Sequence, residues 1–354
     1  MPIDSGYSGD VSELAVHKPL VDAFGRTARD LRVSLTDRCN LRCTYCMPAE
    51  GMEWLPNDKV LSDAEVIRMV RIAVETLGIV KVRFTGGEPL LRKGLEEIVA
   101  GVSQFRTVDG GRPELMLTTN GLGLEHRARA LKDAGLDRVN ISLDSLEPER
   151  YARLARRDRL HDVLAGIEAS AEVGLTPVKV NSVIMRGQNE QDIVPLADYC
   201  LRRGHQLRYI EQMPLGPHDQ WHRKDMVTQT EILEALSEHY TLTPASTPRG
   251  AAPAELWDVA PDADQAGGRI GVIASVTNPF CGSCDRTRLT ADGQMRNCLF
   301  SRTETDLRGP LREGATDEQI AELWLGGQAS KLAGHGIGEP TFQQPERNMS
   351  AIGG

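Results

Sequence analysis

From Leu31 onward, short apolar segments alternate with amphipathic helical patterns, and this alternation limits the possible folds more than any other feature. We expect strands at 31–36, 80–86, 114–120, 138–144, 178–184 and 206–212, with helices at 62–77, 94–104, 124–134, 161–173 and 190–203. Strands that alternate with helices form parallel sheets in α/β folds. Six such units fit a partial (β/α) barrel or a doubly wound sheet, and both place chemistry at the carboxyl ends of the strands.

Composition excludes several classes of protein. The chain has 354 residues, 40% of them hydrophobic, which is enough for a large core. No apolar run at the start resembles a signal peptide, and no stretch approaches the roughly 20 apolar residues of a membrane span. A net charge of −9 argues against an extended nucleic-acid-binding face. We therefore expect a cytoplasmic protein that binds neither membranes nor nucleic acids.

The seven cysteines form two triplets and one remainder. They are Cys39, Cys43 and Cys46, then Cys200, then Cys281, Cys284 and Cys298. Because the cytosol keeps thiols reduced, structural disulfides are not expected. Cys200 lies in an apolar-periodic segment and is predicted to be a small buried hydrophobic residue.

Each triplet lacks a fourth protein ligand. The first has the spacing C-x₃-C-x₂-C directly after a strand, and the second has C-x₂-C-x₁₃-C. Thiolates favour zinc, Cu(I) or iron–sulfur clusters, and a closed tetrahedral zinc site needs four ligands. The six cysteines could form one zinc site with two spare thiols, and the second triplet could bind zinc. We favour two iron–sulfur clusters, each with one iron open to a small molecule.

Cationic residues occur where a parallel sheet is normally apolar. They are Arg32, Arg83, Lys179 and Arg208 on four strands, with Arg286 and Arg288 just after Cys284. A single such charge could reach solvent at a strand end. This many would leave the interior unpaired unless an anion fills it. Because the guanidinium fork suits phosphate oxygens, we predict a polyphosphate ligand.

Polar and glycine-rich segments follow neighbouring strands and favour one shared site with the first cysteine loop. They are Gly86-Gly87-Glu88-Pro89, Thr119-Asn120-Gly121, and Ser142 with Asp144. Glycines after a strand allow close approach of the backbone to a ligand, and Glu88 could accept a hydrogen bond from an ammonium group. Gly353-Gly354, judged by physics alone, is an ordinary frayed terminus.

After about Leu242 the pattern changes to a proline-containing connection, followed by an apolar strand at 270–276, a hairpin through Asp292-Gly293 and a helix at 317–332. We therefore divide the chain into four parts. These are a lead-in (1–30), a partial barrel (31–241), a second-cluster unit that closes the barrel (242–333) and a glycine-rich tail (334–354).

The first cysteine motif, with Tyr45 before its third cysteine and a Gly-Gly-Glu-Pro loop after the next strand, resembles the radical S-adenosylmethionine (SAM) superfamily. The second triplet, with Arg286-Thr287-Arg288, is similar to the members that cyclise GTP in molybdenum cofactor biosynthesis, from about Val21 to the end. The resemblance implies an α/β fold, a partial (β/α)6 TIM-type barrel with a C-terminal extension carrying a second iron–sulfur cluster. It also implies two [4Fe–4S] clusters, held by the six triplet cysteines, and SAM.

The resemblance assigns further roles to matching residues. SAM contacts are expected from Tyr45, Gly87, Ser142 and Met213. GTP contacts are expected from Arg32, Arg83, Thr118, Lys179, Arg286, Thr287 and Arg288. The catalytic group comprises Arg286, Arg288, Arg32, Gly353 and Gly354, so the resemblance reverses the interpretation of the terminus as frayed. Asp285 departs from the Asn found in many members.

The reaction implied by the resemblance begins with reductive cleavage of SAM at the first cluster to methionine and a 5′-deoxyadenosyl radical. This radical abstracts hydrogen from C3′ of GTP, the carbon radical attacks C8 of guanine, and reduction completes the product, (8S)-3′,8-cyclo-7,8-dihydroguanosine 5′-triphosphate. The open iron of the second cluster meets the guanine base.

The implied partners are GTP, an electron donor protein and, for product hand-off, a cyclic pyranopterin monophosphate synthase; monomer and homodimer are both open. Two alternatives are a radical SAM peptide maturase with an auxiliary cluster and a non-catalytic zinc- or nucleotide-binding protein.

Overall fold

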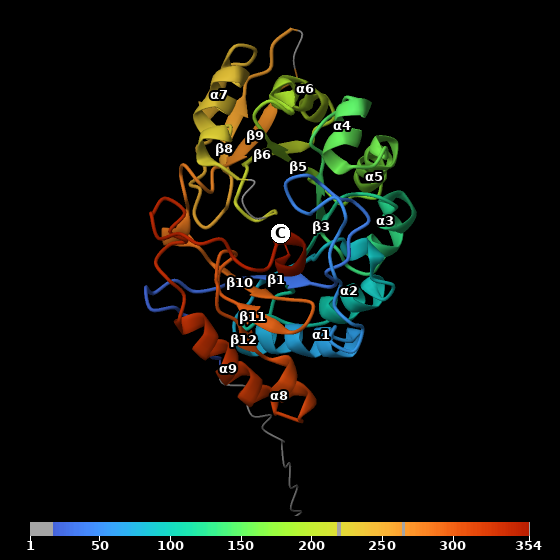
Figure 1. Ribbon diagram of the computed structural model, residues 1–354. Coiled ribbons are helices and arrows are strands. Elements are labelled where there is room, and N and C mark those ends of the chain that lie inside the picture. Colours follow the sequence, from blue (N-terminus) through green and yellow to red (C-terminus); the bar gives the residue numbers. More distant parts are fainter. Residues whose placement is uncertain (1–16, 218–220, 264–265, 354) are drawn as a thin grey trace, which may run out of the picture.

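The computed structural model describes residues 17–217, 221–263 and 266–353. Its centre is a twelve-stranded sheet in the order β12-β11-β10-β1-β2-β3-β4-β5-β6-β9-β8-β7. The six strands that come first in the chain pair parallel to one another. They are β1 (Asp30–Ser34), β2 (Lys81–Thr85), β3 (Glu114–Thr119), β4 (Arg138–Ser142), β5 (Lys179–Ile184) and β6 (Gln206–Glu211). This sheet curves around a central space (Figure 1). The predicted partial barrel is therefore confirmed, and a doubly wound sheet is excluded.

Helices cover the outer side of the curved sheet (Figure 1). They are α1 (Asp63–Arg71), continued by the π-helix η1 (Ile72–Thr76), then α2 (Leu95–Ser103), α3 (Leu124–Asp133), α4 (Pro148–Ala155), α5 (Leu160–Glu172) and α6 (Ile193–Arg202). Short 3₁₀ turns, η2 (Pro89–Leu91) and η3 (Glu190–Asp192), lie between them. Ser62 and Glu65 form a capping box that fixes the start of α1. Helix α4, which the sequence analysis did not predict, begins with Pro148 behind the cap residue Glu147.

The segment after β6 extends both edges of the same sheet. It contains η4 (Arg223–Asp225), α7 (Gln229–Ser237), β7 (Leu242–Pro244), β8 (Glu255–Val259), β9 (Gly268–Ile273), η5 (Cys281–Ser283), β10 (Arg286–Leu289), β11 (Gln294–Arg296), β12 (Thr305–Asp306), α8 (Arg308–Arg312), α9 (Asp317–Ala329) and α10 (Met349–Ile352). Strand β9 pairs parallel with β6, and β10 pairs parallel with β1. The hairpin predicted through Asp292-Gly293 joins β10 to β11. Hydrogen bonding thus continues across the predicted boundary at 242, because both open barrel edges receive partner strands.

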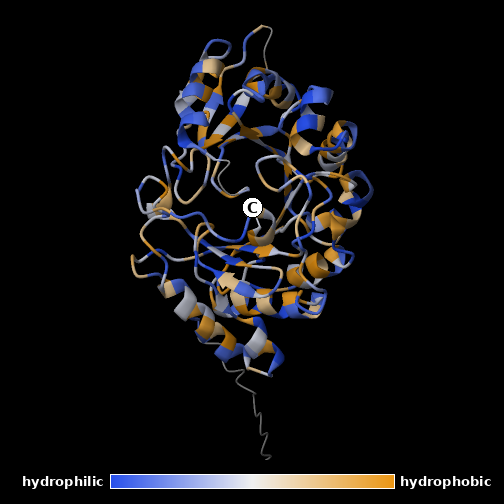
Figure 2. Ribbon diagram, viewed as in Figure 1, coloured by the Kyte–Doolittle hydropathy of each residue, from blue (hydrophilic) through white to orange (hydrophobic). Residues whose placement is uncertain are grey.

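The main core lies between the sheet and its outer helices. On β1 and β2 the side chains of Leu31, Val33, Val82 and Phe84 are completely buried, and Figure 2 shows apolar colour on the helix faces turned toward the sheet. Cys200 is also completely buried, as predicted. Within the described part of the chain, no helix is both long enough and apolar enough to cross a membrane.

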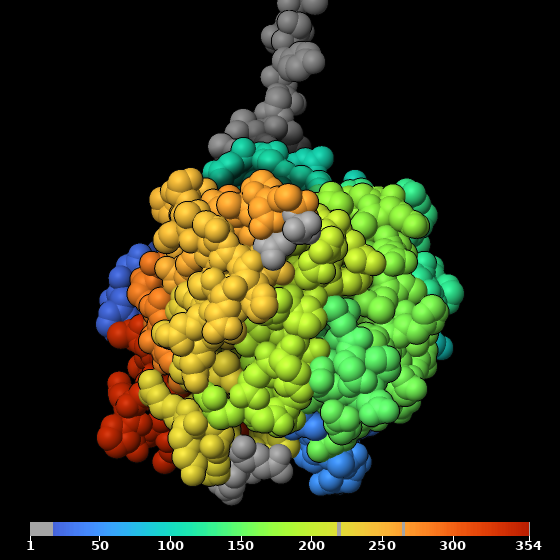
Figure 3. Space-filling view, turned by 90° about the horizontal axis from the view of Figure 1, so that it is seen from above, coloured from blue at the N-terminus to red at the C-terminus, as the bar shows by residue number. Residues whose placement is uncertain are grey.

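The C-terminal region packs next to the N-terminal residues, as the red and blue surfaces in Figure 3 show. Arg26 joins them by donating to the carbonyl oxygens of Leu332 (2.6 Å) and Ala333 (2.9 Å). The C-terminal segment then enters the barrel, where the short red helix α10 lies near the centre of Figure 1.

Candidate active site

The inner face of the sheet lines a cavity of about 600 Å3. Side chains alternate between the two faces of a strand, so Arg32 and Arg83 face the cavity while their neighbours Leu31 and Val82 face the helices. This alternation explains how a parallel sheet tolerates cations: one of its faces contacts the core and the other contacts a cavity. All six triplet cysteines also line this cavity.

The first triplet lies on the loop after β1, at the carboxyl ends of the strands. The loop is held by α4: the amides of Arg42 and Thr44 donate to the carbonyls of Ala155 (3.1 Å) and Leu154 (2.9 Å). Asn120 donates to the sulfur of Cys39 at 3.8 Å. Burial raises the pKa of Cys39 to about 11. Bound iron would supply the positive charge that holds such buried sulfurs as thiolates.

The Gly-Gly-Glu-Pro loop packs directly on this cysteine loop. The amides of Gly87 and Glu88 donate to the carbonyls of Thr36 (2.8 Å) and Arg38 (2.7 Å). A Cβ at Gly87 would collide with the carbonyl oxygens of Asp37 and Arg38. Glycine at 87 is therefore required for the two loops to approach each other.

Glu88 has a different role from the one expected. Its carboxylate is completely buried, does not line the cavity, and accepts from Leu90 N (2.9 Å), Thr119 Oγ1 (2.7 Å) and Asn120 N (2.7 Å). Burial raises its pKa to about 7. The expectation that Glu88 accepts from a ligand's ammonium group is wrong, because its oxygens already tie together the loops after β2 and β3.

The predicted SAM contacts Tyr45, Gly87, Ser142 and Met213 all line the cavity. The Tyr45 hydroxyl donates to Asp144 Oδ2 at 2.9 Å, and burial raises the pKa of Asp144 to about 6. The other Asp144 oxygen accepts from the Val183 amide at 2.9 Å. This region thus places Tyr45 and the buried carboxyl of Asp144 beside the three sulfurs.

The second triplet lies on the segments that follow β9 (Cys281 and Cys284) and β11 (Cys298), and its surroundings are cationic. Lys331 Nζ lies 3.3 Å and Arg286 Nη1 lies 3.9 Å from the Cys284 sulfur. Burial alone would raise the pKa of Cys284, but Lys331 and Arg286 lower it. The sequence analysis missed Lys331 because it stands far from Cys284 in the chain, at the end of α9, where it resembles an ordinary helix-terminal lysine.

The predicted phosphate-binding cations gather on adjacent strands. Arg32 lies opposite Arg83 on β2 and opposite Arg288 on β10. Burial, together with the positive charge of Arg286, lowers the pKa of Arg32 to about 9. Among the described residues, no hydrogen-bond partner is found for Arg32 Nε or for Arg83 Nε and Nη1. The Asp30 carboxylate offsets part of the charge of Arg32 and Arg83. One carboxylate cannot balance both buried guanidinium groups, so the cavity favours a further anion.

Lys179 and further cations extend this group toward the amino ends of the strands. Burial, followed by the charges of Arg208 and Arg138, lowers the pKa of Lys179 to about 6. Lys81 and Arg138, which the sequence analysis did not select, begin β2 and β4 and also line the cavity. The site therefore extends along the strands and is not confined to their carboxyl ends.

Thr118 lines the cavity as predicted, but Thr287 does not. Thr287 is completely buried on the opposite face of β10, where its hydroxyl accepts from Trp324 Nε1 at 3.0 Å. Strand alternation explains the difference, because Arg286 and Arg288 occupy the inner face. The expected contact between the Thr287 side chain and a ligand in the cavity is therefore wrong.

The C-terminal tail reaches the same group of cations. Arg288 Nη1 donates to the Gly353 carbonyl, and Ser34 Oγ donates to the Ile352 carbonyl at 2.9 Å. Gly353 has a φ of +84°, and a Cβ there would collide with Ser34 Oγ. Glycine is thus needed at 353 both for the backbone conformation and for the close packing. Gly354 lies outside the described residues.

Each triplet offers three thiols, whereas a structural zinc site requires four converging ligands. All seven cysteines are described and none forms a disulfide. Two separate groups of three free thiols facing one cavity fit iron–sulfur clusters, which Cys thiolates hold.

Comparison with known proteins agrees with this geometry. The family described as "Radical SAM superfamily" matches residues 33–200, and "Molybdenum Cofactor Synthesis C" matches residues 205–337. The structure of SuiB from Streptococcus suis bound to S-adenosylmethionine aligns with a TM-score of 0.59 at 12% identity, covering 93% of this chain and 76% of that one. At this identity the likeness concerns the fold alone.

Curated relatives are much closer in sequence. A GTP 3',8-cyclase of Corynebacterium glutamicum is 63% identical over 339 residues, covering 96% of this chain and 90% of the relative. A GTP 3',8-cyclase of Mycolicibacterium smegmatis is 57% identical over 347 residues, covering 98% and 95%. Similarity this high over nearly the full length shows that the chain belongs to the GTP 3',8-cyclase family of the radical SAM superfamily.

Proposed function

We propose that this chain is a radical SAM lyase that converts GTP to (8S)-3′,8-cyclo-7,8-dihydroguanosine 5′-triphosphate, the first step of molybdenum cofactor biosynthesis. The observation that carries this proposal is one cavity lined by two cysteine triplets and by buried cations whose charge the neighbouring Asp30 offsets only in part. Family membership supports the reaction class and the cofactors, iron–sulfur clusters and SAM.

The residues that would hold the cofactors are the six triplet cysteines, with Tyr45, Gly87, Ser142 and Met213 around SAM. When bound, the clusters and SAM supply the electron and the 5′-deoxyadenosyl radical that removes hydrogen from C3′ of GTP. The protein positions the sulfurs through the α4 contacts and the Glu88 network, and it keeps Tyr45 in place through Asp144. This division, in which the cofactor carries the chemistry and the protein orients it, is typical of cofactor enzymes.

The cations would hold the triphosphate of GTP. Arg32 and Arg83 are register partners on β1 and β2, Lys179 lines the same cavity from β5, and Arg83 and Lys179 are each 8% exposed. Arginine can bind phosphate oxygens through two parallel hydrogen bonds. Arg286 and Arg288 would then direct the guanine base toward the second triplet, which lies beside them in sequence and in space. Thr118 completes this group from β3.

We further propose a cytoplasmic enzyme that receives electrons from a donor protein. It would pass its product to a cyclic pyranopterin monophosphate synthase. Monomeric and homodimeric assemblies are both compatible with a cavity formed within one chain.

The test is anaerobic incubation of the reconstituted protein with SAM, a strong reductant and GTP deuterated at C3′. We expect 5′-deoxyadenosine to carry deuterium and to form faster with GTP than without it, together with a cyclised nucleotide. Unlabelled 5′-deoxyadenosine, formed equally well without GTP and without a nucleotide product, would contradict the proposed substrate.

A further inference from the structure

Within the C-terminal tail, Arg347 lies just before α10, and the proposed reaction assigns it no role. We infer that Arg347 is a positioning residue that fixes the C-terminal tail beside Arg288 by pairing with Asp292 and Glu304. The consequence for catalysis rests on the proposed function, whereas the position of the tail can be measured without any turnover.

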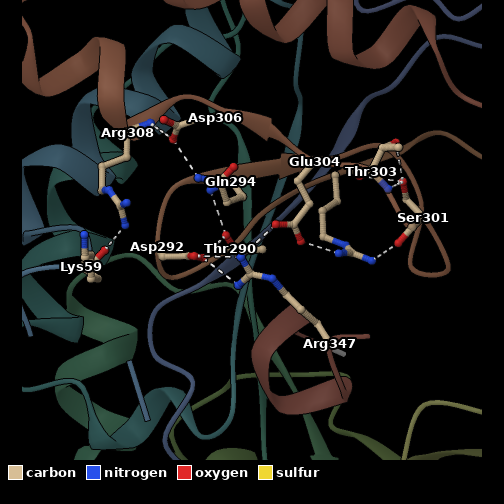
Figure 4. Close-up of polar contacts among 11 residues, drawn as sticks. Lys59, Thr290, Asp292, Gln294, Ser301, Thr303, Glu304, Asp306, Arg308 and Arg347 are labelled. Carbon is tan, nitrogen blue, oxygen red and sulfur yellow. Dashed lines mark hydrogen bonds and ion pairs between the residues drawn. The ribbon is translucent and has the colours of Figure 1, made fainter. Parts of the chain in front are cut away.

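Arg347 makes a bidentate ion pair (Figure 4). Its Nη1 lies 3.0 Å from Asp292 Oδ1, and its Nη2 lies 2.9 Å from Asp292 Oδ2 and 2.8 Å from Glu304 Oε2. The side chains are 26%, 10% and 20% exposed, respectively. Two parallel hydrogen bonds in a largely buried setting give this pair a defined geometry, unlike an exposed surface pair.

The two acceptors are themselves held in place. Thr290 Oγ1 donates to Asp292 Oδ1 at 2.6 Å, and Arg296 donates to the other oxygen of Glu304. Because Asp292 and Thr290 belong to the turn between β10 and β11, Arg347 binds directly to this hairpin. The same hairpin carries Arg288 on β10 and leads to Cys298 after β11. This ion pair thus fixes the position of the tail relative to Arg288, a proposed substrate-binding residue, and to the second triplet.

The residues after Arg347 make further contacts, including those of Asn348 and Ser350 with the Met52 sulfur. The Met349 amide donates to the Leu215 carbonyl at 3.0 Å, Ile352 is buried, and the terminal carbonyls meet Ser34 and Arg288. Helix α10 has four residues, too few to be stable by itself. A charged anchor just before this helix therefore limits where Met349 and Ser350, both of which line the cavity, can lie.

The test compares Arg347→Gln, Arg347→Lys, Asp292→Asn and the double variant Arg347→Gln/Asp292→Asn, each as reconstituted holoenzyme. Arg308→Gln is the matched control, because Arg308 lies on the same side, donates to the Lys59 carbonyl at 2.7 Å and does not contact the tail (Figure 4). Hydrogen exchange is followed by mass spectrometry in a peptide covering the amides of residues 349–353.

We expect exchange in this peptide to be roughly tenfold faster in Arg347→Gln, consistent with loss of a hydrogen bond between charged groups. Arg347→Lys should restore part of the protection, and the double variant should exchange no faster than Arg347→Gln, because both changes remove the same pair. Wild-type exchange in Arg347→Gln, or an equal acceleration in Arg308→Gln, would overturn the inference. If Arg347→Gln does not fold, Asp292→Asn and Arg347→Lys decide the question by the same criterion.

A second readout separates positioning from general destabilisation. In Arg347→Gln we expect kcat for cyclisation to fall with little change in KM for SAM, and more 5′-deoxyadenosine to form per cyclised product. An unchanged product ratio together with faster tail exchange would show that Arg347 holds the tail without aiding the reaction and would overturn the catalytic part of the inference. If the wild-type protein produces no cyclised nucleotide, the proposed function fails, but the exchange data still decide the role of Arg347.

Discussion

The region around the first triplet and the region of the cations contain buried ionisable groups of opposite kinds within one cavity. Near the first triplet the buried groups are acids, and burial raises the pKa of Glu88 to about 7 and of Asp144 to about 6. In the cationic region, burial lowers the pKa of Arg32 to about 9 and of Lys179 to about 6. The acids are satisfied by internal hydrogen bonds, whereas guanidinium nitrogens of Arg32 and Arg83 lack partners among the described residues. The first region is therefore preorganised, and the second is incomplete until an anion binds.

The largest effect should follow from Cys43→Ser in the first triplet. This change should abolish both SAM cleavage and GTP turnover and reduce iron from about eight to about four atoms per chain, since a four-iron cluster requires its thiolates. Iron analysis and 5′-deoxyadenosine measurement check it. Cys200→Ser is the control, because Cys200 packs in the core. Persistent SAM cleavage in Cys43→Ser would contradict the division between the two regions.

Cys298→Ser should separate the two regions. We expect loss of the cyclised nucleotide while reductive cleavage of SAM at the first cluster is still possible, because Cys298 belongs to the cationic side of the cavity. The measurements are nucleotide product and 5′-deoxyadenosine in the same reaction. GTP turnover at the wild-type rate would rule out the second cluster as part of the site.

The pH dependence of GTP binding should report on Lys179. With a pKa of about 6, Lys179 is mostly neutral at pH 8 in the free protein. A bound triphosphate favours the charged form and raises this pKa, so binding takes up a proton. Affinity should therefore strengthen by up to about tenfold per pH unit as pH falls from 8 toward 6, and level off below 6.

Titration calorimetry in buffers of different ionisation enthalpy measures this proton uptake. Lys179→Met should bind GTP more weakly and lose the part of the pH dependence due to Lys179, while the part due to the nucleotide's own phosphate remains. Identical proton uptake in the wild-type protein and Lys179→Met would show that Lys179 is already charged before GTP binds.

The smallest effect on the reaction is expected from Thr287→Val. Because Thr287 faces Trp324 and not the cavity, KM for GTP should hardly change. Loss of the hydrogen bond leaves a buried indole N–H unpaired and should lower the free energy of unfolding by about 1–2 kcal/mol. Denaturant unfolding and steady-state kinetics check the two parts. A large increase in KM would place Thr287 at the substrate after all.

Structural features that depend on residues close together in the sequence were predicted correctly. The six barrel strands agree with the sequence pattern within one or two residues at each end, and the capping box at Ser62 and the turn at Asp292-Gly293 occur as expected. These signals depend on periodicity and on residues a few positions apart. Helix α4 was missed although Tyr151, Leu154 and Ala155 form a buried face at helical spacing, and this helix supports the first cysteine loop.

By itself, the sequence determined the alternating barrel, the two incomplete sulfur sites and the presence of buried cations, since each depends on residue type and local spacing. Tertiary structure alone decided which face each side chain occupies: it turned Thr287 toward Trp324, brought Lys331 to Cys284 and placed Gly353 against Arg288. Tertiary structure also decided that β9 and β10 pair with the two edge strands of the barrel, β6 and β1. The physical reason is that strand pairing and contacts between residues distant in the chain depend on the whole packed molecule, which no local pattern records.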